Sequence, residues 1–267
     1  MNNPTDPKTA ETIDFGFETI GRSQKARRVR GVFDSVASDY DLMNDLMSAG
    51  IHRVWKSVLL DRLMPRPGQH LLDVAGGTGD VGIGFVKRAE NWAHLNPERA
   101  SEKPPARASL CDINHEMLKA GLTRTACGLE NQITRICGNA EQLPLPAGSV
   151  DAYTIVLGIR NVTDRDAALR EAARVLRPGG RFICLEFSHL ILESLQKLYD
   201  QYSFNVIPWL GERVVGDRAS YLYLVESIRK FPTQDAFAAQ IRKAGLDRVK
   251  VENLTGGVVA LHMAWRL

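Results

Sequence analysis

The sequence has little of what marks several broad classes of protein. Only four of its 267 residues are cysteines, and they stand apart without C-x-x-C spacing. Neither a zinc site nor a disulfide framework is therefore expected. The six histidines are equally dispersed, so no metal site is predicted. No run approaches the ~20 apolar residues of a membrane-spanning helix, and the polar N-terminus lacks the apolar core of a signal peptide. These absences predict a cytoplasmic protein.

Net charge is also low. A formal charge of +3 is too small to imply nucleic-acid binding by itself. Five basic side chains lie between residues 22 and 30. Such a stretch could contact the inner face of an anionic membrane, and a solvated helix start explains it equally well.

The most informative segment runs from 71 to 80 and reads LLDVAGGTGD. An apolar strand enters a glycine-rich turn, and a helical pattern follows. Glycine allows positive φ and close approach of a ligand, and the helix start offers unpaired N–H groups. This combination is typical of nucleotide sites. The third glycine of the dinucleotide fingerprint G-x-G-x-x-G is missing in this frame.

Strand and helix patterns alternate along the rest of the chain. Strands are expected over 70–74, 106–111, 133–137, 152–157 and 181–186, with helices between them and a closing hairpin over 248–253 and 258–265. Such alternation predicts an α/β fold with a doubly wound, mostly parallel seven-stranded sheet. An irregular insertion is expected over 90–105. The expected domains are a flexible tail over 1–20 and a single domain over 21–267, with N-terminal helices over 32–63 and a helical lid over 190–231.

Polar residues follow four of these strands. In open α/β sheets, ligands bind outside the carboxyl ends of the strands, so these residues are expected to share one edge. Asp73, Gly77, Thr78 and Gly79 follow the first strand, and Asp112, whose carboxylate could bind both ribose hydroxyls, ends the second. The third strand is followed by Asn139 and Ala140, and the fourth by Arg160 and Asn161. Each position alone is as well explained by a helix cap, and their convergence favours a cofactor site.

Adenosylmethionine and NAD would share the adenosine contacts. A NAD-dependent oxidoreductase usually needs a separate substrate domain, and the chain beyond the fifth strand is too short for one. A methyltransferase needs only to exclude water and align a nucleophile, which suits a small lid. The N-P-P-[YF] tetrad of methyltransferases that act on base amines is absent, since Gly158-Ile159-Arg160-Asn161 occupies its place.

Two segments resemble a known family closely. Residues 40–55 match the pattern Y-D-x-M-N…S-x-G-x-H-R-x-W, and residues 174–188 match R-V-L-K-P-G-G…L-E-F-S. With residues 157–164 and 198–208 they resemble the ubiquinone/menaquinone biosynthesis C-methyltransferase family (UbiE/Coq five-like), over about 15–267. The resemblance implies a class I, Rossmann-like methyltransferase. It would use S-adenosyl-L-methionine to methylate a ring carbon of a polyprenylated benzoquinol, and demethylmenaquinol is a further substrate to test.

Family contacts with the cofactor carry over onto Thr78, Asp112, Asn139 and Ala140. Val156 stands where the family often has a serine, which puts that hydroxyl contact in doubt. A non-catalytic cofactor-binding scaffold within a quinone-synthesis complex therefore stays open as an alternative.

The expected chemistry gives roles to further residues. A quinol hydroxyl has a pKa near ~10, so the site must stabilise the phenolate or remove its proton. Arginine stays protonated, so Arg160 is expected to stabilise the phenolate and Asn161 to orient a water or the ring hydroxyl. His52 has the pKa range of a base, and a structural role explains it equally well. The remaining substrate candidates, equally credible as packing, are Tyr40, Met43, Asn44, Tyr199 and Tyr202.

A prenyl tail would also bear on partners. Each buried CH₂ contributes about 0.8 kcal/mol, so the tail is expected to bind the apolar lid or stay in the bilayer. The expected partners are a polyprenyl quinol, a peripheral membrane contact, and a quinone-biosynthesis complex or homodimer. No nucleic acid is expected.

Overall fold

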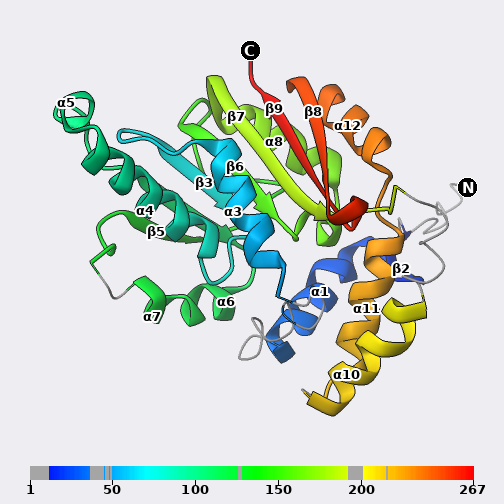
Figure 1. The fold of residues 1–267 in the computed structure, drawn as a ribbon. Coiled ribbons are helices and arrows are strands. Elements are labelled where there is room, and N and C mark those ends of the chain that lie inside the picture. The colour runs from blue at the N-terminus through cyan, green and yellow to red at the C-terminus, as the bar shows by residue number, and fades with distance from the viewer. Residues whose placement is uncertain are drawn as a thin grey trace, which may run out of the picture.

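A computed structural model describes residues 12–36, 45, 48, 50–125, 128–191, 201–214 and 216–267. Its centre is a seven-stranded sheet with strand order β5-β4-β3-β6-β7-β9-β8 (Figure 1). Strand β9 pairs antiparallel with both β7 and β8, and the pairs among β3, β4, β5, β6 and β7 are parallel. The seven strands are β3 (His70–Val74), β4 (Arg107–Asp112), β5 (Ile133–Cys137), β6 (Val150–Val156), β7 (Leu176–Phe187), β8 (Asp247–Leu254) and β9 (Val259–Trp265).

Helices connect and cover these strands. The α-helices are α1 (Arg22–Val36), α3 (His52–Leu63), α4 (Asp80–Leu95), α5 (Pro97–Ala100), α6 (His115–Ala120), α7 (Leu122–Thr125), α8 (Arg165–Val175), α10 (Ile207–Val214), α11 (Arg218–Arg229) and α12 (Gln234–Lys243). Shorter turns are the 3₁₀ segments η1 (Ile159–Asn161) and η3 (Thr255–Gly257) and the π segment η2 (Tyr202–Val206).

The two faces of the sheet bury separate cores. Helices α3 and α4 pack on one face, and α8 and α12 pack on the other. One core gathers side chains such as Leu59, Phe85 and Leu185, and the other gathers Leu169, Phe182 and Phe237. Strand β6 is buried along nearly its whole length, as expected of a parallel strand covered on both faces. The predicted doubly wound α/β class and the closing hairpin are confirmed.

The N-terminal segment differs from the predicted tail. Thr12–Phe15 (β1) and Glu18–Gly21 (β2) form an antiparallel hairpin. The hairpin is held by long-range contacts: the ring of Phe15 stacks on Tyr223 with centroids 4.1 Å apart, and the Phe17 N–H donates to Glu226 at 2.9 Å. Such distant partners give no local signal, so the sequence alone did not predict these strands.

Two other boundaries also differ from expectation. The segment 90–105, predicted as an irregular insertion, continues α4 to Leu95 and then forms α5. Pro97 takes the first position of α5, where its missing N–H costs nothing. Helix α1 begins at Arg22, ten residues ahead of the predicted helical region.

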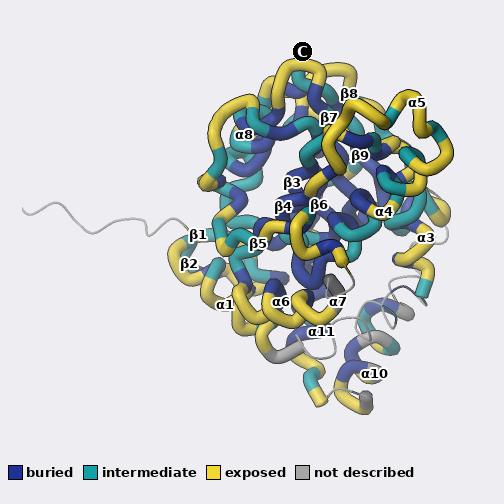
Figure 2. Tube along the Cα trace, turned by 90° about the vertical axis from the view of Figure 1, so that its left-hand side faces the viewer, coloured by how far each residue is buried: buried dark blue, intermediate teal, exposed yellow. Residues whose placement is uncertain are grey.

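A cap lies against the carboxyl ends of the strands. We use this name for the β1–β2 hairpin with α1, α10 and α11, which gather at one end of the sheet (Figure 1). Helix α11 contacts both α1 and η1, and η1 follows β6 directly. The strands at the centre are buried and much of the cap is exposed (Figure 2). Among the described residues, no helix is both long enough and apolar enough to span a bilayer.

Candidate active site

The glycine-rich turn after β3 has the backbone conformations that its sequence predicts. Gly77 and Gly79 have positive φ values of 50° and 93°, and Ala75 joins them at 52°. A Cβ on Gly79 would lie 2.7 Å from Leu110 of the neighbouring strand. Glycine is therefore required at 79 both by conformation and by space. The turn leads directly into α4, whose first residue is Asp80.

Asp73 lies under this turn at the end of β3. Its carboxylate is 2 % exposed and accepts a hydrogen bond from Thr154 Oγ1 at 2.7 Å. Burial raises the pKa of Asp73 to about 7, and the Thr154 bond opposes that shift. Asp73 and Thr78 line a small cavity together with Lys56 and Asp80, which form an ion pair at 2.7 Å. This cavity therefore offers charges of both signs to a zwitterionic amino-acid group.

The Asp112 side chain links the turn after β3 to the loop after β4. One carboxylate oxygen accepts from the Gly77 N–H at 2.9 Å, and the other accepts from the Asn114 N–H at 2.8 Å. Burial raises the pKa of Asp112, while the backbone N–H bonds act in the opposite direction. Each oxygen keeps a second lone pair, so the carboxylate is fixed in place and can still accept from a ligand.

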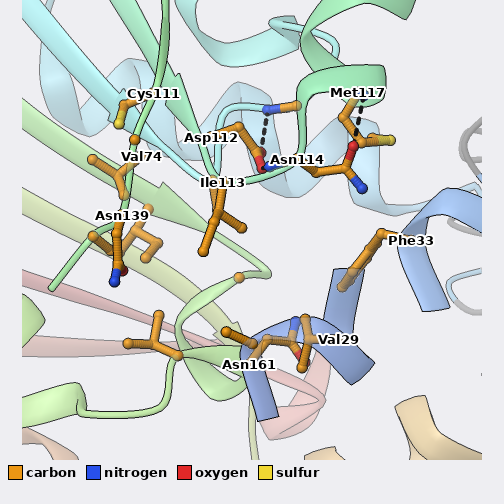
Figure 3. Close-up of a pocket in the computed structure, with 18 of the residues that line it drawn as sticks. Val29, Phe33, Val74, Cys111, Asp112, Ile113, Asn114, Met117, Asn139 and Asn161 are labelled. Carbon is orange, nitrogen blue, oxygen red and sulfur yellow. Dashed lines mark hydrogen bonds between the residues drawn. The ribbon is translucent and has the colours of Figure 1, made fainter. Parts of the chain in front are cut away.

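A larger cavity begins where Asp112 ends and includes about 830 Å³ of empty space. Asn139 and Ala140 line it after β5, and Met117 lines it from α6 (Figure 3). It shares Ala75, Val156 and Leu157 with the small cavity beside Asp73. The two cavities therefore adjoin along the carboxyl ends of β3 and β6.

Helix α1 closes the open side of the larger cavity. Ala26, Val29, Arg30 and Phe33 line it, and Figure 3 shows Val29 and Phe33 near Asn161 and Ile113. Their i, i+3, i+4 and i+7 spacing is the one signal that could have found this face. The sequence did not single out these residues because the stretch 22–30 was interpreted by its basic side chains alone.

Arg160 belongs to a buried ion pair. Its Nη1 donates to Glu186 at 2.6 Å and also to the Leu157 carbonyl at 2.6 Å. The side chains are 4 % and 1 % exposed, and the Phe187 N–H donates to the same Glu186 oxygen at 2.9 Å. The Nε of Arg160 is buried with no hydrogen-bond partner in the described part of the chain. Glu186 therefore fixes a guanidinium that keeps an unused donor.

Asn161 lines the larger cavity beside this pair. Its Oδ1 accepts from the Tyr223 hydroxyl at 3.0 Å, which leaves the amide NH₂ free to orient toward the cavity. The ring of Tyr223 in turn stacks on Phe15 of the hairpin. Neither Tyr223 nor Glu186 was predicted, because only the fold brings them to the end of β6.

The loops after β3 and β6 interlock. Leu157 adopts a positive φ of 54°, which is unfavourable for a leucine. A Cβ on Gly158 would lie only 2.5 Å from the Cβ of Ala75. Non-glycine residues in this region persist where the surrounding structure holds them, often at functional sites. The two strained positions, Ala75 and Leu157, both line the two cavities.

The predicted substrate residues have different outcomes. His52 is 2 % exposed at the start of α3, with Nδ1 at 3.0 Å from Ser48 Oγ, and lines neither of these cavities. Burial lowers the pKa of His52. Tyr40, Met43, Asn44 and Tyr199 lie outside the described residues, as does the side chain of Tyr202.

The arrangement fits S-adenosylmethionine. The glycine turn forms a cradle that a Cβ would fill, since one on Gly77 would lie 3.2 Å from Met117. Asp73 stands at one end of the adjoining cavities and Asp112 at the other, with Asn139 beyond it. These groups suit a cationic amino-acid end, a ribose and an adenine respectively.

Comparisons with known proteins give the family. The sequence model of the "ubiE/COQ5 methyltransferase family" matches residues 21–266. The chain is similar to a protein of Caulobacter vibrioides named ubiquinone/menaquinone biosynthesis C-methyltransferase UbiE, with 53% identity over 96% of this chain and 98% of that one. A protein of the same name from Paracoccus denitrificans is 51% identical over 99% of both chains.

Solved structures agree at the level of the fold. A SAM-dependent methyltransferase from Aquifex aeolicus superposes with a TM-score of 0.55 at 14% identity, over 79% of this chain and 89% of that one. The match over nearly the whole length, together with the cradle and its two carboxylates, places the chain in the ubiE/COQ5 methyltransferase family, as an enzyme that takes its methyl group from S-adenosylmethionine.

Proposed function

We propose that this enzyme methylates a ring carbon of a polyprenylated quinol in ubiquinone/menaquinone biosynthesis, with a benzoquinol as the first substrate to test and demethylmenaquinol as the second. The names of the relatives support the reaction class. Within the structure, the observation that carries the proposal is Arg160, a buried cation at the end of β6 beside the cofactor cavity.

The proposed chemistry follows from the pKa of the substrate. A ring carbon ortho or para to a hydroxyl becomes a good nucleophile only when that hydroxyl loses its proton, at a pKa near ~10. When bound, S-adenosylmethionine supplies an electrophilic methyl group. The enzyme must then lower the energy of the phenolate, and a preorganised cation does so best in a water-excluded site.

Arg160 is suited to this role. A guanidinium supplies a positive charge, and the unpartnered Nε of Arg160 can donate to a phenolate or to an ordered water. Glu186 holds the group in one orientation, so little reorganisation is needed during reaction. Asn161, fixed by Tyr223, would position the ring hydroxyl or that water.

The same proposal assigns the cofactor contacts. Asp112 would accept both ribose hydroxyls through its free lone pairs, and Asn139 and Ala140 would contact the adenine edge. Asp73 would pair with the ammonium group, with the backbone at Gly77, Thr78 and Gly79 around the amino-acid end.

Incubation with methyl-labelled S-adenosylmethionine tests the reaction. A short-chain demethyl benzoquinol and a short-chain demethyl naphthoquinol, each reduced with dithionite, would be offered separately. Label on a ring carbon is expected, and the preferred quinol identifies the substrate. Absence of label from both quinols, with cofactor binding confirmed by calorimetry, would favour the scaffold alternative. Competition by NAD for the cofactor cavity would favour an oxidoreductase.

We also propose a peripheral membrane contact through the cap. Phe17 on the hairpin is 54 % exposed and Trp209 on α10 is 49 % exposed, and both belong to elements beside the site. A prenyl tail could pass from the bilayer along these aromatic groups. Flotation with liposomes tests this contact, and protein that stays wholly in the soluble fraction would contradict it. A homodimer or a quinone-biosynthesis complex stays a prediction for light scattering and pull-down.

A further inference from the structure

A third cavity lies beside the methyl-transfer site. It includes about 1,040 Å³ of empty space and is lined by the hairpin, α1, η1, the start of α8, α11 and α12. We call it the cap chamber. It shares only Thr163 with the cofactor cavity, and Arg160 borders it from η1. Its walls are mostly polar, which makes it unsuited to a prenyl chain.

Most of the charges in the cap chamber are paired. Arg22 contacts Asp164 at 2.7 Å and Lys230 contacts Asp14 at 3.5 Å, with all four side chains between 30 and 51 % exposed. Asp166 is 3.9 Å from Lys243, which lies outside the chamber lining. The acidic groups of the chamber therefore already have cationic partners.

Two cations are left over. Lys25 is 5 % exposed and lines the chamber, and it has no ion pair or hydrogen bond among the residues that the structure describes. Arg165 also has no ion pair and no hydrogen bond among the described residues. Its Nε is buried, and its guanidinium lies 5.7 Å from the ring centre of Phe231. A buried charge without a partner is costly. The buried Lys25 and the half-buried Arg165 face one chamber, which indicates that a bound anion completes the site.

The electrostatics of Lys25 and Arg165 agree with a bound anion. Burial and the nearby Arg165 charge lower the pKa of Lys25 to about 8, although Asp14 and Glu141 oppose the shift. Burial likewise lowers the pKa of Arg165. Both groups still carry their protons at neutral pH. The first turn of α8 also borders the chamber, and the N-terminus of a helix favours negative charge.

We propose that the cap chamber is an anion site that binds a phosphate group through Lys25 and Arg165. Two positive charges match a doubly charged phosphate, and a guanidinium and an ammonium are the groups that proteins use to hold one. The phosphate would come either from a free molecule in solution or from the headgroup of an anionic lipid. It would tie α1 of the cap to α8 of the main domain. This inference does not depend on the identity of the methyl acceptor.

The test compares four proteins by isothermal titration with inorganic phosphate and by thermal unfolding with and without it. They are the wild type, Lys25→Met, Arg165→Gln and the control Lys87→Met, which removes the same charge at an exposed position on α4, outside the chamber. Phosphate is expected to raise Tm of the wild type and of the control equally. Either chamber variant should weaken the phosphate Kd at least tenfold.

Lys25→Met carries a second readout that a structural lysine would not give. Without phosphate its Tm should be unchanged or higher, because the variant removes an unpaired buried charge at nearly constant volume. The rise in Tm on addition of phosphate should disappear. If phosphate raises Tm of this variant as much as it does in the wild type, the ion binds elsewhere and the proposal is wrong.

Vesicles distinguish the two sources of phosphate. The same proteins would be floated with phosphatidylcholine vesicles, with or without phosphatidic acid. Binding of inorganic phosphate that is lost in Lys25→Met supports a soluble ligand. Retention on phosphatidic acid that is lost in both chamber variants but kept in Lys87→Met, without binding of inorganic phosphate, supports a lipid headgroup. If neither phosphate nor vesicles bind in a way that depends on Lys25, the proposal is overturned.

Discussion

The two sides of the reaction site are built differently. On the strand side, Asp112 is held by two backbone N–H groups, and the loops after β3 and β6 interlock at Ala75 and Gly158. On the cap side, side chains make the contacts: Phe15 stacks on Tyr223, and Arg22 pairs with Asp164. In the proposed assignment, backbone geometry therefore fixes the side that binds the cofactor, and individual side-chain contacts hold the side that binds the substrate.

This difference suggests a division of labour. A cofactor that is the same in every turnover can be bound by a rigid cradle. A long apolar substrate needs an opening, and elements held by a few side-chain contacts can open at low cost. Substitutions on the strand side should therefore change cofactor affinity, and those on the cap side should change turnover.

Arg160 provides the largest expected effect. Arg160→Met should lower kcat by about 10²–10³, the usual loss of a charge-stabilising group, with an unchanged Kd for S-adenosylmethionine. It should also cost about 3 kcal/mol of unfolding free energy, because the buried Glu186 carboxylate loses its partner. Steady-state kinetics, calorimetry and urea unfolding measure the three quantities.

A double variant separates stability from chemistry. Arg160→Met with Glu186→Gln should regain most of the stability and stay inactive, since no buried charge is left unpaired and the amide oxygen still accepts from the Phe187 N–H. If the double variant recovers activity as well, Arg160 has only a structural role.

Asp112 tests the strand side. Asp112→Asn should weaken the Kd for S-adenosylmethionine by about 10- to 100-fold, which corresponds to the ~1.5–3 kcal/mol of hydrogen bonds to a charged group. Turnover at saturating cofactor should change little. Glu116→Gln, an exposed carboxylate on the neighbouring α6, is the matched control and should bind like the wild type. A drop in kcat with an unchanged Kd for S-adenosylmethionine would contradict the expected separation of roles between the strand side and the cap side.

Asp73 gives a pH dependence. Its folded pKa of about 7 lies above the ~3.9 of an unfolded aspartate, so the folded state binds more protons between these values. The stability of the cofactor-free protein should therefore fall as pH rises from 4 to 7. Binding of an ammonium group requires the ionised carboxylate, so cofactor affinity should rise about tenfold from pH 6 to 8.

The variant Asp73→Asn isolates this group. It should lose the tenfold rise in affinity and should be more stable than the wild type at pH 8 without cofactor, because no buried carboxylate ionises. Calorimetry and urea unfolding at pH 6 and 8 check both effects. A pH profile of affinity identical to that of the wild type would assign the titration to another group.

Tyr223 should give the smallest effect. Tyr223→Phe removes the hydrogen bond to Asn161 and keeps the stack on Phe15, so kcat should fall about 2- to 10-fold, as expected for one neutral hydrogen bond. The cofactor Kd should not move. An equal loss in both parameters would mean that the cap and strand sides are not independent.

The strand side was also the predictable side. Asp73, Asp112 and Asn139 could be placed from the sequence, because each lies at or just after the carboxyl end of a strand and parallel strands align their carboxyl ends. Glu186 and Tyr223 could not, since they reach the site only through pairings with residues 26 and 62 positions away. Lys25 shows most clearly what the sequence could not predict. It belongs to a basic stretch that was expected to be solvated or to contact a membrane, but it is buried and lines the cap chamber.

The hairpin at residues 12–21 has one more consequence. Through Phe15 it touches Tyr223, and Tyr223 touches Asn161, so two side chains separate the start of the described chain from the reaction site. The turn of the hairpin is secured by Glu226, which accepts from the Phe17 N–H and leaves no room for a side chain at Gly16. With Asn161 in its proposed role, a proteolytic cut within residues 12–21 is expected to change turnover, so kinetic measurements would report the state of the hairpin as well as that of the site.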